Sequence, residues 1–240
     1  MREPCLNAML ALDRRLAPGI FDADWYVLRT LRSAIRRTLA DDRVSLQGAR
    51  VIDLGCGTRP YESLFAAAGA HYQGADIAGQ PDITIRADGT VAAPDGQYAV
   101  VASFQVLEHV WDVATYLREA RRLLKPGGWL LLSTHGTWLY HPHPGDYRRW
   151  TAEGLRREVE AHGFRLEKML PVVGPLAWTT VFRSLGACHA LKKLPLLGTL
   201  LASSAAALFN VRAWIEDRIT PEAMIAANAC VYVGLFSREG

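Results

Sequence analysis

Cysteine is scarce in this chain, and its spacing excludes the sites that cysteine commonly builds. The four cysteines lie far apart, with neither a Cys-x-x-Cys pair nor a nearby histidine at metal-site spacing: Cys5, Cys56, Cys188 and Cys230. Neither a zinc site nor a disulfide framework is therefore predicted. This cysteine usage fits the reducing cytoplasm.

The chain also lacks a basic block, an export signal and a long apolar run. Lys and Arg outnumber Asp and Glu by only 27 to 24, with the two signs interspersed, so nucleic acid is not an expected partner. The first residues do not follow the order of a secretory signal, so we expect a cytoplasmic protein. The uncharged stretch Leu194–Phe209 has 16 residues, which is shorter than the roughly 20 of a membrane-spanning helix.

Strand-like and helix-like segments alternate along the chain, which is typical of an α/β protein with a mainly parallel sheet. A chain of 240 residues, half of them apolar, is long enough for one such domain with a substantial core. Thr151 is expected to cap a helix, and Lys125-Pro126-Gly127-Gly128 to separate a helix from the next strand. The expected strands are 50–54, 71–76, 83–86, 98–103, 129–134, 164–170 and 229–237; the expected helices are 24–39, 61–68, 113–124 and 151–163.

A glycine loop follows the first of these strands. In Val51-Ile52-Asp53-Leu54-Gly55-Cys56-Gly57-Thr58, two glycines let the backbone turn sharply and let a ligand approach closely. Asp76 ends the next strand, 23 positions after Asp53, where a carboxylate can accept hydrogen bonds from ribose hydroxyls. Together these features predict a nucleotide-type site, although each aspartate alone could merely cap a turn.

This set resembles the successive motifs of class I S-adenosylmethionine-dependent methyltransferases. The resemblance rests on Asp53-x-Gly55-x-Gly57, Asp76, Asp88, Ser103–Val110 and Lys125–Gly128, and it extends from about Val51 to Thr134. His143–Thr151 also resembles a segment of the branch called type 11 methyltransferases, which includes members associated with surface-glycan and lipid biosynthesis. The resemblance implies a Rossmann-like, seven-stranded, mainly parallel sheet with helices on both faces and an antiparallel last strand.

The resemblance also implies S-adenosylmethionine as the cofactor and gives each matching residue a role. Asp53 would lie near the methionine ammonium group, Gly55 and Gly57 would shape the loop below it, and Asp76 would hold the ribose. Asp88 would accept from the adenine amino group. The remaining cofactor-binding positions implied are Ile77, Gly89, Phe104, Gln105 and Leu107. A nicotinamide enzyme is the weaker alternative, because Arg59-Pro60 stands where its third glycine should be.

Within one domain over 1–240, we expect an N-terminal helical extension at 1–45, a cofactor-binding core at 46–170 and a final strand at 229–240. Between them, 171–228 is an apolar helical insertion or cap. The expected roles of the 171–228 segment are to cover the sheet, to form a homodimer surface, or to contact a membrane peripherally. Basic residues flank its uncharged stretch and keep the last reading open: Arg183, Lys192, Lys193 and Arg212.

Histidine is the natural general base near neutral pH, and it gathers after the expected fourth and fifth strands. The candidate catalytic residues are His109, His135 and His143. The candidate acceptor-binding residues are His141, Asp146, Tyr147 and Arg148. Anchoring of a turn or a loop is the alternative role for each. No metal is expected, because His141-Pro142-His143 lacks an evident third ligand.

The sequence therefore predicts an enzyme that methylates a small molecule, a glycan precursor or a lipid-linked acceptor, with oxygen as the expected atom. A noncatalytic cofactor-binding protein and a membrane-surface protein that retain the fold are the alternatives. Methylation of O, N and C uses the same kind of cofactor site, so the acceptor does not follow from these residues.

Overall fold

The computed structural model describes residues 14–142 and 144–240. The chain forms two compact units: one holds Ile35–Leu170 with Tyr232–Gly240, and the other holds Pro171–Val231 with the described residues up to Ala34. Helix α2 (Trp25–Leu39) crosses the boundary between them. The candidate site lies entirely in the first unit.

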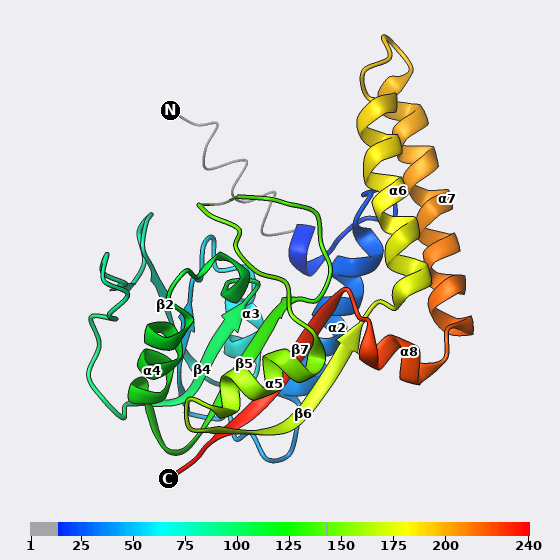
Figure 1. Ribbon diagram of the computed structural model, residues 1–240. Coiled ribbons are helices and arrows are strands. Elements are labelled where there is room, and N and C mark those ends of the chain that lie inside the picture. The colour runs from blue at the N-terminus through cyan, green and yellow to red at the C-terminus, as the bar shows by residue number, and fades with distance from the viewer. Residues whose placement is uncertain (1–13, 143) are drawn as a thin grey trace. The chain divides into compact units, whose positions relative to one another are not determined.

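A seven-stranded sheet in the order β3-β2-β1-β4-β5-β7-β6 forms the first unit. Its strands are β1 (Arg50–Leu54), β2 (His71–Asp76), β3 (Ile83–Thr84), β4 (Tyr98–Phe104), β5 (Leu124–His135), β6 (Phe164–Val172) and β7 (Val231–Arg238). The first five strands of this order are parallel, and β7 runs opposite to β6 (Figure 1). The predicted architecture and its antiparallel last strand are confirmed.

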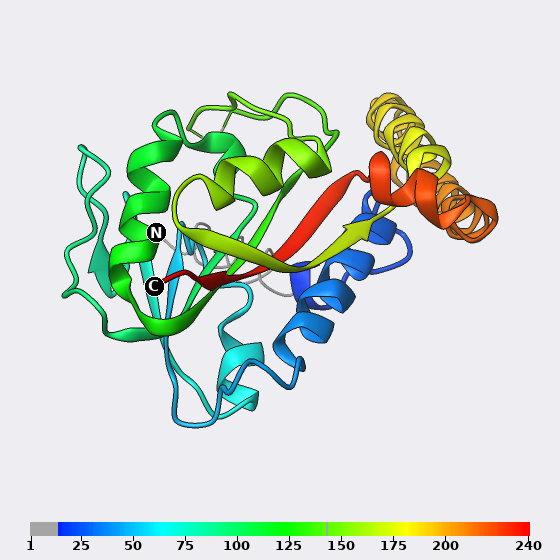
Figure 2. The ribbon, with the colours of Figure 1, turned by 60° about the horizontal axis from the view of Figure 1, so that its bottom comes forward.

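Helices cover both faces of this sheet. Figure 2 shows α4 (Val113–Leu123) and α5 (Ala152–Glu160) on one face and α3 (Glu62–Ala67) on the other. Every residue of the central strand β4 is buried, as expected for a strand covered on both sides. Two helices begin at a residue whose side chain caps the helix. The Asp112 side chain accepts from the Thr115 amide, and the Thr151 side chain, as predicted, accepts from the Gly154 amide.

The sequence-based boundaries are wrong at five strands, of which β4 ends one residue later than expected, at Phe104, and β6 two residues later, at Val172. Strand β5 begins at Leu124 rather than 129, because β5 advances five residues, from Leu124 to Trp129, where β4 advances only two, from Tyr98 to Val100. The predicted stop Lys125–Gly128 is therefore an irregularity within the strand. Strand β3 ends at Thr84 because Ile85 turns to form an antiparallel bridge with Val91, and β7 begins at 231 rather than 229.

The second unit is mainly a helical hairpin of α6 (Pro175–Leu191) and α7 (Gly198–Ile219), followed by the short α8 (Glu222–Ala227). The two long helices lie side by side (Figure 1). Small side chains of Cys188, Ala202 and Ala206 form the buried cluster between them, which lets the backbones approach closely. The chain leaves the helix at Lys192 and re-enters it at Gly198, around the predicted Pro195 break.

Polar side chains of α7 fasten this hairpin to the start of α2. Asn210 Nδ2 donates to the carbonyls of Ile20 and Asp22, at 2.8 and 2.7 Å. The Asp217 carboxylate accepts from the hydroxyl of buried Tyr26 at 2.8 Å and from the Gly174 amide at 2.6 Å. In the described part of the chain, no helix is both long and apolar enough to span a membrane.

We expect Asp217→Ala to lower the free energy of unfolding by about 1–3 kcal/mol, because it leaves the Tyr26 hydroxyl and the Gly174 amide without their acceptor. Urea denaturation followed by circular dichroism measures the change, with Asp42→Ala, at an exposed position, as the control. Equal stability of the two variants would mean that the Asp217 contacts contribute nothing.

Candidate active site

The predicted site residues gather at one edge of the sheet. Strands β1, β2, β4 and β5 are parallel, so their carboxyl ends meet there. The segments that follow these strands bring together Gly55–Gly57, Asp76, Gln105–His109 and His135. In open α/β sheets this edge is where ligands bind.

The glycine loop is shaped by a close approach to the segment that follows β4. Gly55 has φ +74°, and a Cβ added there would lie 2.6 Å from Val106 Cγ2. The Gly55 amide donates to the Ala75 carbonyl at 2.8 Å, which ties the turn to β2. Gly57, at φ +52°, has nothing within 4 Å of its built Cβ, so the second half of the loop lies open.

Asp76 holds the open half of that loop. One carboxylate oxygen accepts from the Gly57 amide at 2.8 Å and the other from the Ile77 amide at 2.7 Å. Each oxygen keeps a further lone pair, and the residue is only partly buried. Asp76 is therefore fixed in orientation and still able to accept hydroxyl donors, while Ile77 beside it is 58% exposed.

The other two aspartates have different surroundings. Asp53 is buried within β1 and accepts from the Tyr72 hydroxyl at 2.7 Å; burial and this carboxylate raise the pKa of Tyr72. Asp88 is bonded within its own turn, where Oδ1 accepts from the amide and hydroxyl of Thr90, at 3.0 and 2.7 Å. Gly89 next to it has φ +84°.

The segment after β4 combines a buried apolar wall with a strained residue. Phe104 and Leu107 are both buried, and Phe104 packs edge-on against Tyr61 with ring centroids 4.8 Å apart. Gln105 has φ +58°, which is unusual for a residue with a side chain. Its amide donates to the Ser133 carbonyl at 2.9 Å, and its Nε2 to Ser133 Oγ at 3.0 Å. Strand β5 thus holds the strained backbone at this edge.

These residues fit a nucleotide-type cofactor. The loop lies open at Gly57, so a ligand could approach its backbone there, and Asp76 offers oriented acceptor oxygens beside it. A sulfonium cofactor bound here would supply an already activated methyl group, which leaves the protein to align the acceptor and exclude water.

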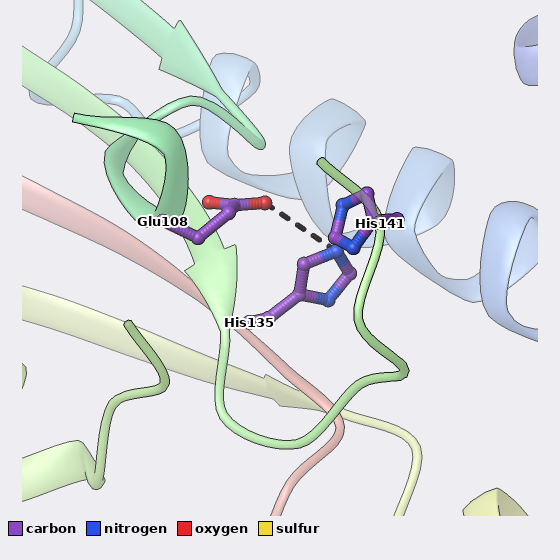
Figure 3. Close-up of side chains that lie close together, drawn as sticks. All are labelled: Glu108, His135 and His141. Atoms are coloured by element: carbon purple, nitrogen blue, oxygen red, sulfur yellow. Dashed lines mark ion pairs between the residues drawn. The ribbon is translucent and has the colours of Figure 1, made fainter. Parts of the chain in front are cut away.

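A compact group of polar side chains lies at the same edge, next to the segment after β4. Figure 3 shows Glu108 and His135 facing each other with His141 beside them. Glu108 Oε1 lies 3.4 Å from His135 Nε2 and 4.0 Å from His109 Nε2. The ring centroids of His109 and His135 lie 4.8 and 5.3 Å from that of His141. Three of the predicted histidines are thus brought together.

Among the residues that the structure describes, two buried atoms of this group have no hydrogen-bond partner: Glu108 Oε1 and His135 Nδ1. The other Glu108 oxygen accepts from the Thr134 hydroxyl at 2.8 Å, which orients the carboxylate. Burial raises the pKa of Glu108 above its usual value and lowers that of His135 well below 6.5. Because an unpaired polar atom in the interior is costly, this group has the character of an incomplete binding site.

The loop after β5 is organised by one ion pair. Arg149 binds Asp146 through both carboxylate oxygens, at 2.5 and 2.7 Å, and donates to the Leu139 carbonyl at 2.9 Å. Asp146 also accepts from the His141 amide at 2.9 Å, and its side chain is almost completely buried. The Arg149 guanidinium holds the pKa of Asp146 well below its usual range. Asp146 therefore positions His141.

The outer part of this loop carries exposed aromatic rings. Tyr147 is half-exposed and meets Trp111 edge-on at 5.2 Å, and Arg148 lies 5.8 Å above the Trp111 ring. Trp111 and Tyr140 are 73% and 75% exposed. The predicted catalytic residue His143 lies outside the described residues.

Sequence reasoning missed Glu108 and Arg149 as members of the site. Glu108 directly precedes a predicted histidine, and Arg149 stands three residues after Asp146. Neither spacing says which side chain is buried, and that burial is what distinguishes Glu108 from an ordinary surface acid.

Comparisons with known proteins identify the family of this chain. A family model described as a methyltransferase domain matches residues 26–169. A "Probable S-adenosylmethionine-dependent methyltransferase" of Mycolicibacterium smegmatis is 30% identical over 184 residues, which are 69% of each chain. A ubiquinone biosynthesis O-methyltransferase of Marinobacter nauticus is 34% identical over 118 residues, covering 42% of this chain and 50% of that protein. The chain thus matches about half the length of the latter relative.

Solved structures of methyltransferases have a similar fold. The crystal structure of an S-adenosylmethionine-dependent methyltransferase from Mesorhizobium loti aligns with a TM-score of 0.53 at 18% identity, covering 92% of this chain and all of that one. The chain belongs to the S-adenosylmethionine-dependent methyltransferases. The predicted family, enzyme class and cofactor are confirmed, and the nicotinamide alternative is excluded.

We expect Asp76→Asn to weaken S-adenosylmethionine binding by at least about tenfold, because hydrogen bonds to a charged acceptor contribute about 1.5–3 kcal/mol. Titration calorimetry measures the affinity, with Asp42→Asn as the control at an exposed position. An unchanged affinity in Asp76→Asn would refute the ribose role of this residue.

Proposed function

We propose that this methyltransferase acts on a hydroxyl oxygen of its acceptor. The observation that carries the proposal is Glu108 Oε1, a buried acceptor atom without a hydrogen-bond partner, at the edge where the cofactor binds. A hydroxyl group supplies the donor that this oxygen lacks. A buried carboxylate oxygen beside imidazole nitrogens suits an acceptor substrate that gives up a proton better than one that has no proton to give.

In the proposed reaction, the acceptor hydroxyl donates to Glu108 Oε1 and is held in line with the methyl group of the cofactor. The oxygen forms its bond to the methyl carbon as the bond from that carbon to sulfur breaks. The hydroxyl proton passes to Glu108 or to a neighbouring imidazole nitrogen, and from there to solvent. Thr134 and Asp146 act as positioning residues, because they orient Glu108 and His141.

The cofactor side of the proposal follows the glycine loop. Asp76 accepts from the ribose hydroxyls, and the backbone at Gly55 and Gly57 borders the methionine part, with Asp53 beneath it. Asp88 and Gly89 border the adenine. Ile77 and Gln105 also border the adenine, on the side next to the ribose. Phe104 and Leu107 are buried, so they support the site from the core and leave the contact to their backbone.

The relatives and the exposed rings support an acceptor with a ring. The Marinobacter nauticus relative is named as an O-methyltransferase of ubiquinone biosynthesis, although the match covers only half of it. Trp111 and Tyr147 offer flat apolar faces beside the loop that carries His141. Such faces stack on aromatic or sugar rings. A small aromatic, glycan or lipid-linked hydroxyl acceptor is the class we propose.

The test compares acceptors that share one ring and differ only in the attacking group. With S-adenosylmethionine and matched phenol and aniline compounds, we expect S-adenosylhomocysteine to form with the phenol. Glu108→Gln should lower kcat by about 100-fold, the lower end of the range for a group that takes up a proton in the reaction, with cofactor affinity unchanged. Preference for the aniline, or full activity of Glu108→Gln, would contradict the proposal.

The hairpin of α6 and α7 supports a lipid-linked acceptor. Its tip, residues 192–201, exposes five leucines: Leu194, Leu196, Leu197, Leu200 and Leu201. Between Glu167 and Glu216 the chain has no acidic residue, whereas Lys192 and Lys193 stand at this tip. An apolar tip with only basic charges complements an anionic lipid surface. We therefore place the enzyme in the cytoplasm, in peripheral contact with a membrane.

Sedimentation with vesicles of anionic lipid at low salt tests this placement. We expect the wild type to bind, and the triple variant of Leu194, Leu196 and Leu197 to Ser to lose at least about tenfold in affinity, because each buried leucine contributes more than 1 kcal/mol. Met224→Ser, on α8, is the matched control, since Met224 is also half-exposed. If the triple variant loses self-association but wild type ignores vesicles, the tip is a homodimer surface instead.

A further inference from the structure

We infer that Glu108, His135 and His141 form a binding site for a divalent cation of the zinc type. One potential ligand atom from each of the three residues lies within 4.8 Å of the other two. Two ligand atoms bound to a tetrahedral zinc at about 2.0–2.1 Å are roughly 3.3 Å apart. The 3.4 Å between Glu108 Oε1 and His135 Nε2 already matches that separation.

The hydrogen bonds around the histidines leave the correct nitrogen available. His141 Nδ1 lies 2.9 Å from the Leu139 carbonyl and 3.4 Å from Asp146 Oδ2, and both of these oxygens can only accept. Nδ1 therefore carries the hydrogen, and the lone pair of the ring is on Nε2. A carbonyl or carboxylate behind the far nitrogen is the usual arrangement around a histidine that binds a metal.

His109 has the same arrangement. Its Nδ1 contacts the Gly145 carbonyl, so its lone pair is on Nε2, which lies 4.0 Å from Glu108 Oε1. His109 and His141 thus each contribute an imidazole lone pair to a group that already holds the unpaired Glu108 oxygen. A cation is what such a group of acceptors lacks.

The donor set selects the kind of cation. Mg²⁺ and Ca²⁺ prefer oxygen ligands, whereas imidazoles with one carboxylate suit zinc and other late divalent transition ions. A set of three protein ligands leaves a coordination position open, as in catalytic zinc sites. The expectation of no metal rested on a missing third ligand. Glu108, on the short helix η1 (Leu107–His109), and His135, at the end of β5, now join His141, and Glu108 is far from His141 in sequence.

Such a cation would deepen the proposed function, on which this role rests, because it would hold the acceptor hydroxyl and favour loss of its proton in place of Glu108. It would be held next to the segment Gln105–Leu107, which directly precedes Glu108 in the chain. The binding site itself does not depend on that role.

The test is a titration of untagged, chelator-treated protein with Co²⁺, followed by visible absorption and by competition with Zn²⁺. We expect one saturable ion per chain and displacement of Co²⁺ by Zn²⁺. His141→Ala and Glu108→Gln should each weaken Co²⁺ binding by at least about tenfold. Even residues that only hydrogen-bond to a metal ligand have an effect of about this size. His71→Ala, at an exposed position in β2, is the matched control and should bind as the wild type does.

Absence of saturable Co²⁺ binding, or equal binding by wild type and both site variants, would overturn the proposed metal site. His141→Ala keeps the test decisive if Glu108→Gln fails to fold, because His141 is on a loop with 30% of its side chain exposed. Methyl transfer to a phenol without Co²⁺ binding would leave the proposed function standing alone. Co²⁺ binding without any phenol methylation would support the metal site and contradict the proposed function.

Discussion

The contact between Gly55 and Val106 is the constraint on which the site depends. The turn after β1 passes so close to the segment after β4 that no side chain fits at Gly55. This approach fixes the position of the open half of the loop, and Asp76 then holds that half by accepting from the Gly57 amide. It also fixes where Val106 lies, and with it Gln105 on one side and Glu108 on the other. One packing contact thus links the glycine loop to the polar group around Glu108.

The polar group is defined by an imbalance between acceptors and donors. Loop carbonyls contact Nδ1 of both His109 and His141, so the lone pair of each ring is on Nε2, which for His109 lies 4.0 Å from Glu108 Oε1. A stable interior usually pairs every buried polar atom, and a half-paired network is less stable than an apolar core of the same shape. A fold that retains such an arrangement therefore has a use for the missing partner. Both a hydroxyl donor and a cation satisfy that need, and they can do so together.

The sequence was sufficient to predict the sheet and the cofactor loop, because local residue patterns determine both. Gly55, Gly57 and Asp76 are placed by the strands next to them in the chain. The acceptor side was only partly predictable. The sequence left open whether Asp146 contacts the acceptor or anchors its loop. The structure shows that it anchors the loop through Arg149, and that pairing depends on the path of residues 136–150. Glu108 gains its character from complete burial, which depends on packing between elements far apart in sequence.

The charge pattern of the second unit is best explained by selection on its surface. The buried contacts between α6 and α7 need small residues such as Ala202 and Ala206, and these place no demand on the outward side. Yet the exposed tip carries leucines with no acid between Glu167 and Glu216. Exposed leucines on a protein that meets only water bring no gain in stability and promote aggregation. Their position beside Lys192 and Lys193 therefore argues for a surface that covers them, and the absence of acids argues that this surface is negatively charged.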